Sequence, residues 1–195
     1  MKRLLPILCL TLAVLLGSAG VSESADFQKG FDAYKRGDYA TALREWTPFA
    51  EQGHARTQHN LGVMYDNGQG VPQDYKTAVK WYRLAAEQRY ASAQYNLGVM
   101  YYEGKGVLQN YKTAVKWYRL AAEQGFANAQ NNLGVMYRKG QGVPQDDKTA
   151  VKWYRLAAEQ GYAFAQNNLG FMYGNGKGVS RDYIRAHMWW SIAAS

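Results

Sequence analysis

The chain is poor in the residue types that most enzymes use for chemistry. Its 195 residues include a single cysteine, Cys9, together with three histidines and four prolines. One cysteine cannot form an intramolecular disulfide, and the histidines, His54, His59 and His187, do not stand at spacings typical of a metal site. The Ser-x-x-Lys motif is absent, which removes the commonest serine route to β-lactam chemistry. The sequence therefore predicts no catalytic residue, no cofactor and no metal site.

The first 20 residues have the composition of an export signal. Lys2 and Arg3 precede an apolar run from Leu4 to Leu16, and small residues follow at 17–20. An anchoring helix is the alternative, but a span needs about 20 apolar residues and this run is shorter. We expect cleavage of a signal peptide at 1–20, which also removes Cys9, and a short linker at 21–25. The protein is then periplasmic or secreted, and no later segment is apolar enough to cross a membrane.

The charge of the chain is basic but moderate. The formal net charge is +8 at pH 7. Such an excess favours acidic partners or anionic surfaces, and it is too small to indicate nucleic acid as a partner.

A repeat of 36 residues dominates the rest of the chain. The tract KTAVKWYRLAAEQ occurs at 76–88, 112–124 and 148–160. Ala93, Leu97 and Met100 have helical spacing before Gly104, and Ala114, Tyr118 and Ala121 have it after the loop. Each unit is therefore predicted to be a pair of helices joined by a glycine loop, in an all-α fold whose units bury surface against their neighbours.

Small and aromatic residues recur where helices are expected to meet. A glycine inside a helix costs ~1 kcal/mol relative to alanine, so a glycine that recurs in every first helix indicates a very close approach of two helices. These glycines are Gly62, Gly98, Gly134 and Gly170, and Ala78, Ala114 and Ala150 are expected to serve the same approach. Trp117, Tyr118 and their equivalents are interpreted as core residues.

These motifs resemble a known family. Ala-x-Ala-Gln-x-x-Leu-Gly-x-Met-Tyr, then Gly-x-Gly-Val, then Ala-x-x-Trp-Tyr-x-x-Ala-Ala is similar to the Sel1-like repeat, a relative of the tetratricopeptide repeat. The resemblance covers four units, at 54–89, 90–125, 126–161 and 162–195, and residues 26–53 resemble a first tetratricopeptide hairpin. It implies a right-handed α-solenoid of antiparallel helix pairs that acts as a protein-binding or peptide-binding scaffold and not as an enzyme.

The candidate binding residues are the outward positions of the first helices, which line the concave face in solenoids of this type. These positions differ between units, and their mixture of aromatic, amide, charged and small apolar groups suits a bound peptide or helix. They are Arg56, His59, Val63, Asp66, Ser92, Tyr95, Val99, Tyr102, Asn128, Asn131, Val135, Arg138, Phe164, Asn167 and Phe171.

Three further hypotheses remain open. A hydrolase acting on cell-wall or β-lactam material would use His59 or Asp66. A basic strip on the second helices could bind anionic lipid or wall polymer; its members are Lys76, Lys80, Arg83, Lys112, Lys116, Arg119, Lys148, Lys152 and Arg155. The last helix has no following helix to cover Trp189, Trp190 and Ile192, and we expect self-association through this end.

Overall fold

The computed structural model describes residues 27–194, so the expected signal peptide with Cys9 and the expected linker lie outside the described residues. Within this range residues 27–35 are helical and no strand occurs. Nine further helices follow: α2 (Tyr39–Glu51), α3 (Ala55–Asn67), α4 (Tyr75–Glu87), α5 (Ala91–Glu103), α6 (Tyr111–Glu123), α7 (Ala127–Lys139), α8 (Asp147–Glu159), α9 (Ala163–Asn175) and α10 (Tyr183–Ala193).

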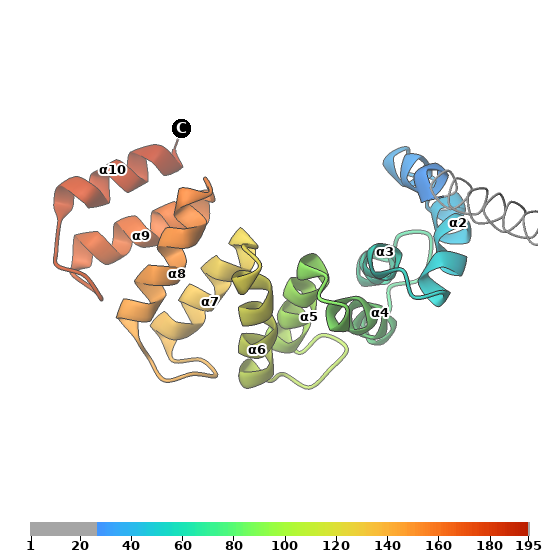
Figure 1. Cartoon of the computed structure of the whole chain (residues 1–195), viewed down its shortest axis with the longest axis horizontal. Helices are drawn as coiled ribbons and strands as arrows, with labels where there is room; N and C mark the ends of the chain where they lie inside the picture. Colours follow the sequence, from blue (N-terminus) through green and yellow to red (C-terminus); the bar gives the residue numbers. More distant parts are fainter. Residues whose placement is uncertain (1–26, 195) are drawn as a thin grey trace, which may run out of the picture.

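The helices are arranged as an α-solenoid, which confirms the predicted fold class. Each helix packs against the helices before and after it in the chain, and the pairs follow one another along an arc (Figure 1). In each of the four repeat units the first helix is α3, α5, α7 or α9 and the second is α4, α6, α8 or α10. Long-range order therefore comes from successive neighbours and not from one central core.

Side chains and glycines set the ends of the helices. Asp74, Asn110 and Asp146 accept backbone hydrogen bonds at the N-termini of α4, α6 and α8. At the other end of the first helices, Gly104 and its equivalents adopt the left-handed conformation that ends a helix, with φ of 75° at Gly104. Side-chain caps and left-handed glycines thus set the predicted alternation of helix, glycine loop and helix.

The core lies between units. One apolar cluster joins Ala114, Tyr118 and Ala121 of α6 to Leu133 and Met136 of α7, and all five side chains are buried. Equivalent clusters join α4 to α5 and α8 to α9. The prediction for Tyr118 is confirmed. The neighbouring Trp117 is only half-buried, because it lies at the edge of the cluster formed by α4 and α5.

The recurring glycines of the first helices face aromatic rings, which confirms the predicted close approach. A Cβ atom on Gly62, Gly98 or Gly134 would lie 2.5 to 2.7 Å from the ring of Tyr82, Tyr118 or Tyr154. Carbon atoms make favourable contacts at about 3.5–4.0 Å, so a methyl group does not fit there. Ala78, Ala114 and Ala150 are fully buried on the facing second helices.

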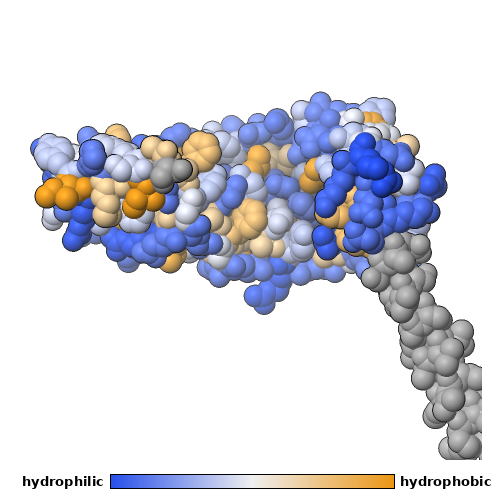
Figure 2. Space-filling view, turned by 90° about the horizontal axis from the view of Figure 1, so that it is seen from above, coloured by the Kyte–Doolittle hydropathy of each residue, from blue (hydrophilic) through white to orange (hydrophobic). Residues whose placement is uncertain are grey.

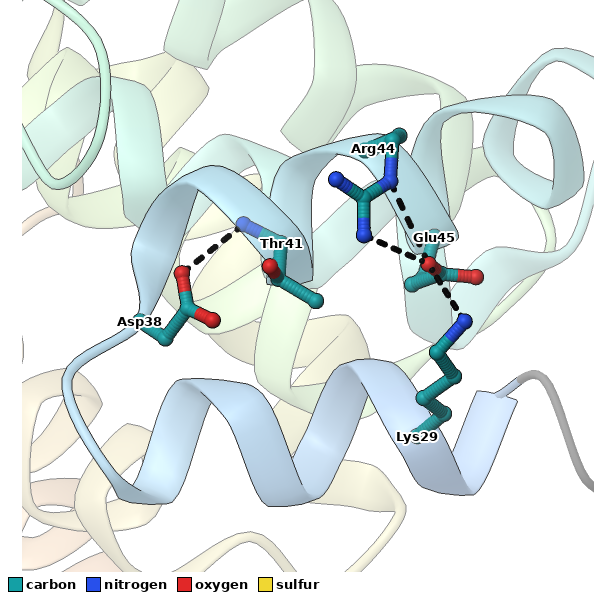
Figure 3. Close-up of polar contacts among 5 residues, drawn as sticks. All are labelled: Lys29, Asp38, Thr41, Arg44 and Glu45. Carbon is teal, nitrogen blue, oxygen red and sulfur yellow. Dashed lines mark hydrogen bonds and ion pairs between the residues drawn. The ribbon is translucent and has the colours of Figure 1, made fainter.

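Polar contacts accompany the apolar core of the N-terminal hairpin (Figure 3). Lys29 and Arg44 both contact Glu45, at 3.0 and 3.1 Å. Asp38 accepts a hydrogen bond from the backbone N–H of Thr41 and begins α2. The Lys29–Glu45 pair therefore joins the two helices of this hairpin.

Candidate protein-binding surface

The outward side chains of the first helices form one candidate site, which we call the first-helix surface. It comprises the fifteen variable positions predicted from the sequence, from Arg56 on α3 to Phe171 on α9. Figure 2 views the arc from above and shows apolar residues scattered among polar ones over its central part. A surface of this mixed composition can bind a partner and yet does not promote non-specific association of the free protein.

The predicted residues differ in how far they reach solvent. Arg56, Phe164, Asn167 and Phe171 are exposed. Asn131 is only 7% exposed and so is not accessible to a partner. Its side-chain amide instead accepts a hydrogen bond from Asn168. The others are half-buried: His59, Val63, Asp66, Ser92, Tyr95, Val99, Tyr102, Asn128, Val135 and Arg138.

His59 and Asp66 both contact neighbouring parts of the fold. The His59 ring lies between Tyr82 and Tyr90, and its Nε2 atom is 3.1 Å from Nδ2 of Asn96 on the next first helix. Burial lowers the pKa of His59 from its ordinary value of 6.5. The carboxylate of Asp66 accepts a hydrogen bond from the Tyr82 hydroxyl. Packing and hydrogen bonding thus account for the two side chains that a hydrolase would use.

Asparagine side chains link α3 to α5 and α7 to α9, and these contacts were not predicted from the sequence. Asn168 donates a hydrogen bond from its amide to Oδ1 of Asn131 at 2.9 Å, in the same relation as Asn96 to His59. The signal was present in the sequence, because an asparagine precedes the repeat leucine in every unit, at Asn60, Asn96, Asn132 and Asn168. A recurring polar residue on a helix surface indicates a contact between units.

Two hollows open on the first-helix surface. One of about 210 Å³ lies at the first junction. It is lined by predicted residues His59 and Val63 and by Phe31, Tyr34, Trp46 and Asn60, which were not predicted as site residues. A smaller one of about 100 Å³ lies between Tyr102, Tyr118, Asn132, Val135 and Met136. Each could receive one side chain of a bound segment.

Cations lie over aromatic rings at both ends of this surface. The Arg138 guanidinium is 5.7 Å and the Lys177 ammonium 5.6 Å from the ring centre of Phe171. At the other end the Arg56 guanidinium is 4.5 Å from the ring centre of Phe27. Such pairs combine positive charge with apolar area, so they present a chemistry suited to acidic segments that also carry aromatic groups.

The basic strip divides into two parts. Its lysines are exposed. Its arginines connect units, since Arg83, Arg119 and Arg155 donate hydrogen bonds to the hydroxyls of Tyr101, Tyr137 and Tyr173 at 2.9, 2.8 and 3.0 Å. The lysines make no such contact between units, whereas the arginines are exposed and also link one unit to the next.

Among residues 27–194, no group of three or more histidine, cysteine, aspartate or glutamate side chains is placed to hold a metal ion. No helix of that same range has the length and hydropathy required to cross a bilayer.

Taken together, stacked helix pairs joined by asparagine, arginine and glycine contacts define a helical repeat protein of the solenoid class. The Sel1 repeat model matches residues 55–90, 91–126, 127–162 and 163–195. The chain therefore belongs to the Sel1 repeat family, in agreement with the resemblance seen in its sequence. No curated protein matches the chain.

Solved structures place the chain among Sel1 repeat proteins. A protective antigen of uropathogenic Escherichia coli with an SLR fold is 47% identical, with a TM-score of 0.76 over 78% of this chain and 32% of the antigen chain. The chain thus spans about a third of that antigen. A Sel1 repeat protein from Oxalobacter formigenes is 38% identical, with a TM-score of 0.82 over 86% of this chain and 69% of the other.

A cysteine-rich relative shares the fold at lower identity. Cysteine rich protein B from Helicobacter pylori is 19% identical, with a TM-score of 0.54 over 65% of this chain and 93% of that chain. This likeness concerns the arrangement of helices alone.

Proposed function

We propose that the first-helix surface of this Sel1 repeat protein binds a protein or peptide segment and that the chain performs no chemistry itself. Sel1 repeats form scaffolds typical of protein–protein interaction. The observation that carries the proposal is a contrast between helices. The second helices α4, α6 and α8 are nearly identical in sequence, whereas most outward positions of the first helices change from unit to unit, with valine kept at Val63, Val99 and Val135. A varied surface on a constant scaffold suits recognition of one particular partner.

The proposed partner segment is acidic and carries aromatic side chains. Arg138 and Lys177 beside Phe171 supply positive charge next to an apolar ring. The hollows beside His59 and Tyr102 offer room for single side chains along the same surface. Arginine and large aromatic residues are the groups that most often dominate binding energy at protein interfaces.

We propose further that the protein is exported and acts outside the cytoplasm. The support is the pattern at residues 1–20, in which two basic residues and a short apolar run precede small residues. The mass of the protein recovered from the cell envelope tests this. A chain that begins between Ala19 and Asp26 supports export, whereas a stable cytoplasmic product that retains Met1 contradicts it.

The binding proposal is tested with peptides selected from a random display library on the folded chain. Phe164 and Phe171 are 69% and 37% exposed, so replacing both with alanine removes binding groups with little effect on the core. We expect the double variant to lose about 2 kcal/mol, or roughly 30-fold, in affinity for the selected peptides.

The matched control removes two exposed leucines from the second helices. Leu84→Ala/Leu120→Ala changes side chains that are 45% and 37% exposed, and it should leave affinity unchanged. Equal affinity of the phenylalanine variant and the wild type would move the binding site away from the first-helix surface. Binding that collapses with added salt and depends on the exposed lysines would indicate the basic strip instead.

A further inference from the structure

The last second helix, α10, differs from the others on its outward side. At three outward positions spaced four residues apart, the earlier units carry lysine, lysine and leucine: Lys76, Lys80 and Leu84; Lys112, Lys116 and Leu120; Lys148, Lys152 and Leu156. The same positions of α10 hold Ile184, Met188 and Ile192, which are 85%, 44% and 43% exposed. The lysines are exposed although another unit follows each of them. Stacking of a further unit therefore does not account for this apolar stripe.

A second side of α10 is open as well. Trp190 is 43% exposed, whereas Tyr154 at the same position of α8 is fully buried beneath α9. Between Trp190 and the stripe lie His187 and Ser191, whose Nδ1 and Oγ atoms are 3.4 Å apart. We call Ile184, Met188 and Ile192 the α10 face, and Trp190 lies on the neighbouring side of the helix. Apolar side chains gather at this end of the molecule in Figure 2, on the left.

The charges around the α10 face indicate which kind of partner it fits. Each of α4, α6 and α8 carries two lysines, an arginine and a glutamate, but the only charged residue within α10 is Arg185, and it pairs with Asp182 at 3.3 Å. The α10 helix has thus lost the lysines that an anionic lipid or wall polymer would attract. Tryptophan and methionine are enriched, and lysine and glutamate depleted, in the cores of protein interfaces. The face fits a neutral, apolar protein surface.

The N-terminal end of the solenoid is not such a surface. Gly30 faces Trp46 as Gly62 faces Tyr82, so Lys29 and Asp32 occupy the positions of the buried Leu61 and Met64. Lys29 pairs with Glu45 at this end (Figure 3). Head-to-tail stacking of two chains would bury these charged groups against Trp190, which is unfavourable. The α10 face itself is the matching apolar surface at the ends of the solenoid.

We propose that the α10 face is the interface of a two-fold dimer, in which α10 of one chain packs against α10 of a second copy. Two identical apolar faces meet in this arrangement without removing an unpaired charge from water. A two-fold interface is also the commonest form of self-association and closes after two chains. The interface uses none of the fifteen residues of the first-helix surface.

Sedimentation equilibrium of the protein purified from the cell envelope tests the dimer. Between about 1 and about 100 µM, the wild-type mass should rise toward that of two chains. Ile184→Lys/Met188→Lys restores the lysines of the earlier units and should give the mass of one chain at all concentrations. Leu84→Lys/Leu120→Lys adds the same charges to exposed positions of α4 and α6 and should dimerise as the wild type does. Circular dichroism checks that both variants keep their helical content.

Several outcomes would overturn the dimer. A wild-type chain that stays monomeric, or an Ile184→Lys/Met188→Lys variant that dimerises as before, removes the α10 face from self-association. Mass that keeps growing beyond two chains indicates head-to-tail stacking. A monomer that binds phosphatidylglycerol vesicles through Ile184 and Met188 indicates a lipid occupant. The single variant Ile184→Lys, at a site 85% exposed, tests the same interface with the least effect on folding.

Discussion

The ring of Tyr118 occupies the space into which a methyl group on Gly98 would point, with a ring carbon 2.7 Å from the position of that Cβ atom. Both residues are buried, and α5 and α6 of the unit meet at this point. The spacing between the two helices is therefore set by the absence of a side chain at one residue and the flat face of the other. The same pair recurs as Gly62 with Tyr82 and Gly134 with Tyr154.

Gly98→Ala should destabilise the protein although alanine is the better helix former. The gain in helix propensity is ~1 kcal/mol, but overpacking of a buried site costs typically ~1–3 kcal/mol and more where the neighbour cannot move. We expect a net loss of stability in urea denaturation. Gly174→Ala is the control, since its Cβ would be 3.3 Å from Trp190, a half-exposed side chain that can shift. Equal stability of the two variants would contradict the packing argument.

Arg89→Gly should stabilise the protein. Arg89 has φ of 65° and is the only described residue other than glycine with positive φ, whereas the equivalent positions hold Gly53, Gly125 and Gly161. A left-handed conformation costs a non-glycine residue roughly 1–2 kcal/mol, part of which glycine offsets by its greater freedom when unfolded. A gain of up to about 1 kcal/mol is expected from denaturant titration. The reverse change, Gly125→Arg, should lower the free energy of unfolding by a similar amount. An unchanged stability would show that the backbone at this position is not strained.

Stability should fall in acid because of the capping aspartates. Asp74 and Asp146 accept hydrogen bonds from the hydroxyls of Thr77 and Thr149 at 2.6 Å, and these bonds lower the pKa of both carboxyl groups below the ordinary 3.8. Because the folded pKa is the lower one, the stabilisation is present above the ordinary value and is lost as pH falls through the folded value. Melting temperature should drop as pH falls below about 4.

Asparagine supplies the control for the capping prediction. Asn110 caps α6 in the native protein, so Asp74→Asn/Asp146→Asn should keep the caps without a titratable group. The variant should show a shallower acid transition than the wild type. If melting temperature falls equally with pH in the two proteins, these aspartates do not cause the loss of stability in acid.

His59→Asn should remove a pH dependence nearer neutrality. Burial lowers the folded pKa of His59, so the unfolded chain takes up a proton first as pH falls through the ordinary 6.5, and the folded state loses stability there. Asparagine occupies the equivalent position at Asn131 and bonds Asn168. Between about pH 7 and about pH 5 the wild type should lose melting temperature and the variant should lose less. A wild-type curve no steeper than that of the variant would show that His59 does not contribute.

Much of the fold could be predicted because each unit repeats its own local chemistry. Helical spacing, glycine stops and the 36-residue register placed the helix pairs, and the recurrence of Gly62, Gly98, Gly134 and Gly170 indicated a close approach of two helices. Exposure was harder to predict. Asn131 lies on the varied side of its helix, yet its side chain bonds Asn168 in the next unit, a contact that depends on how far successive helices rotate. Likewise, Lys177 joins Phe171 only because the loop after α9 folds back.

Side-chain exposure was equally hard to predict in the first and last described helices. The sequence placed Trp190 in the last described helix, where it is 43% exposed. It did not indicate that Ile184 and Met188 extend the apolar area, because that conclusion requires knowing which positions of the earlier second helices remain exposed. Lys29 and Asp32 in the first hairpin could not be matched to the buried positions of the later units from the sequence. That match requires the contact between Gly30 and Trp46, which aligns the first hairpin with the repeats.

The buried glutamine of each first helix makes the array tolerant to changes in length. Gln94 donates to the carbonyl of Ala86 in the preceding unit, and Gln130 donates to that of Ala122 in the same way. Because Ala86 and Ala122 lie in identical tracts, deletion of residues 91–126 would bring Gln130 to Ala86 with its acceptor in place. Removal or duplication of a whole unit therefore preserves this contact between units, so the length of the first-helix surface can change in steps of one unit.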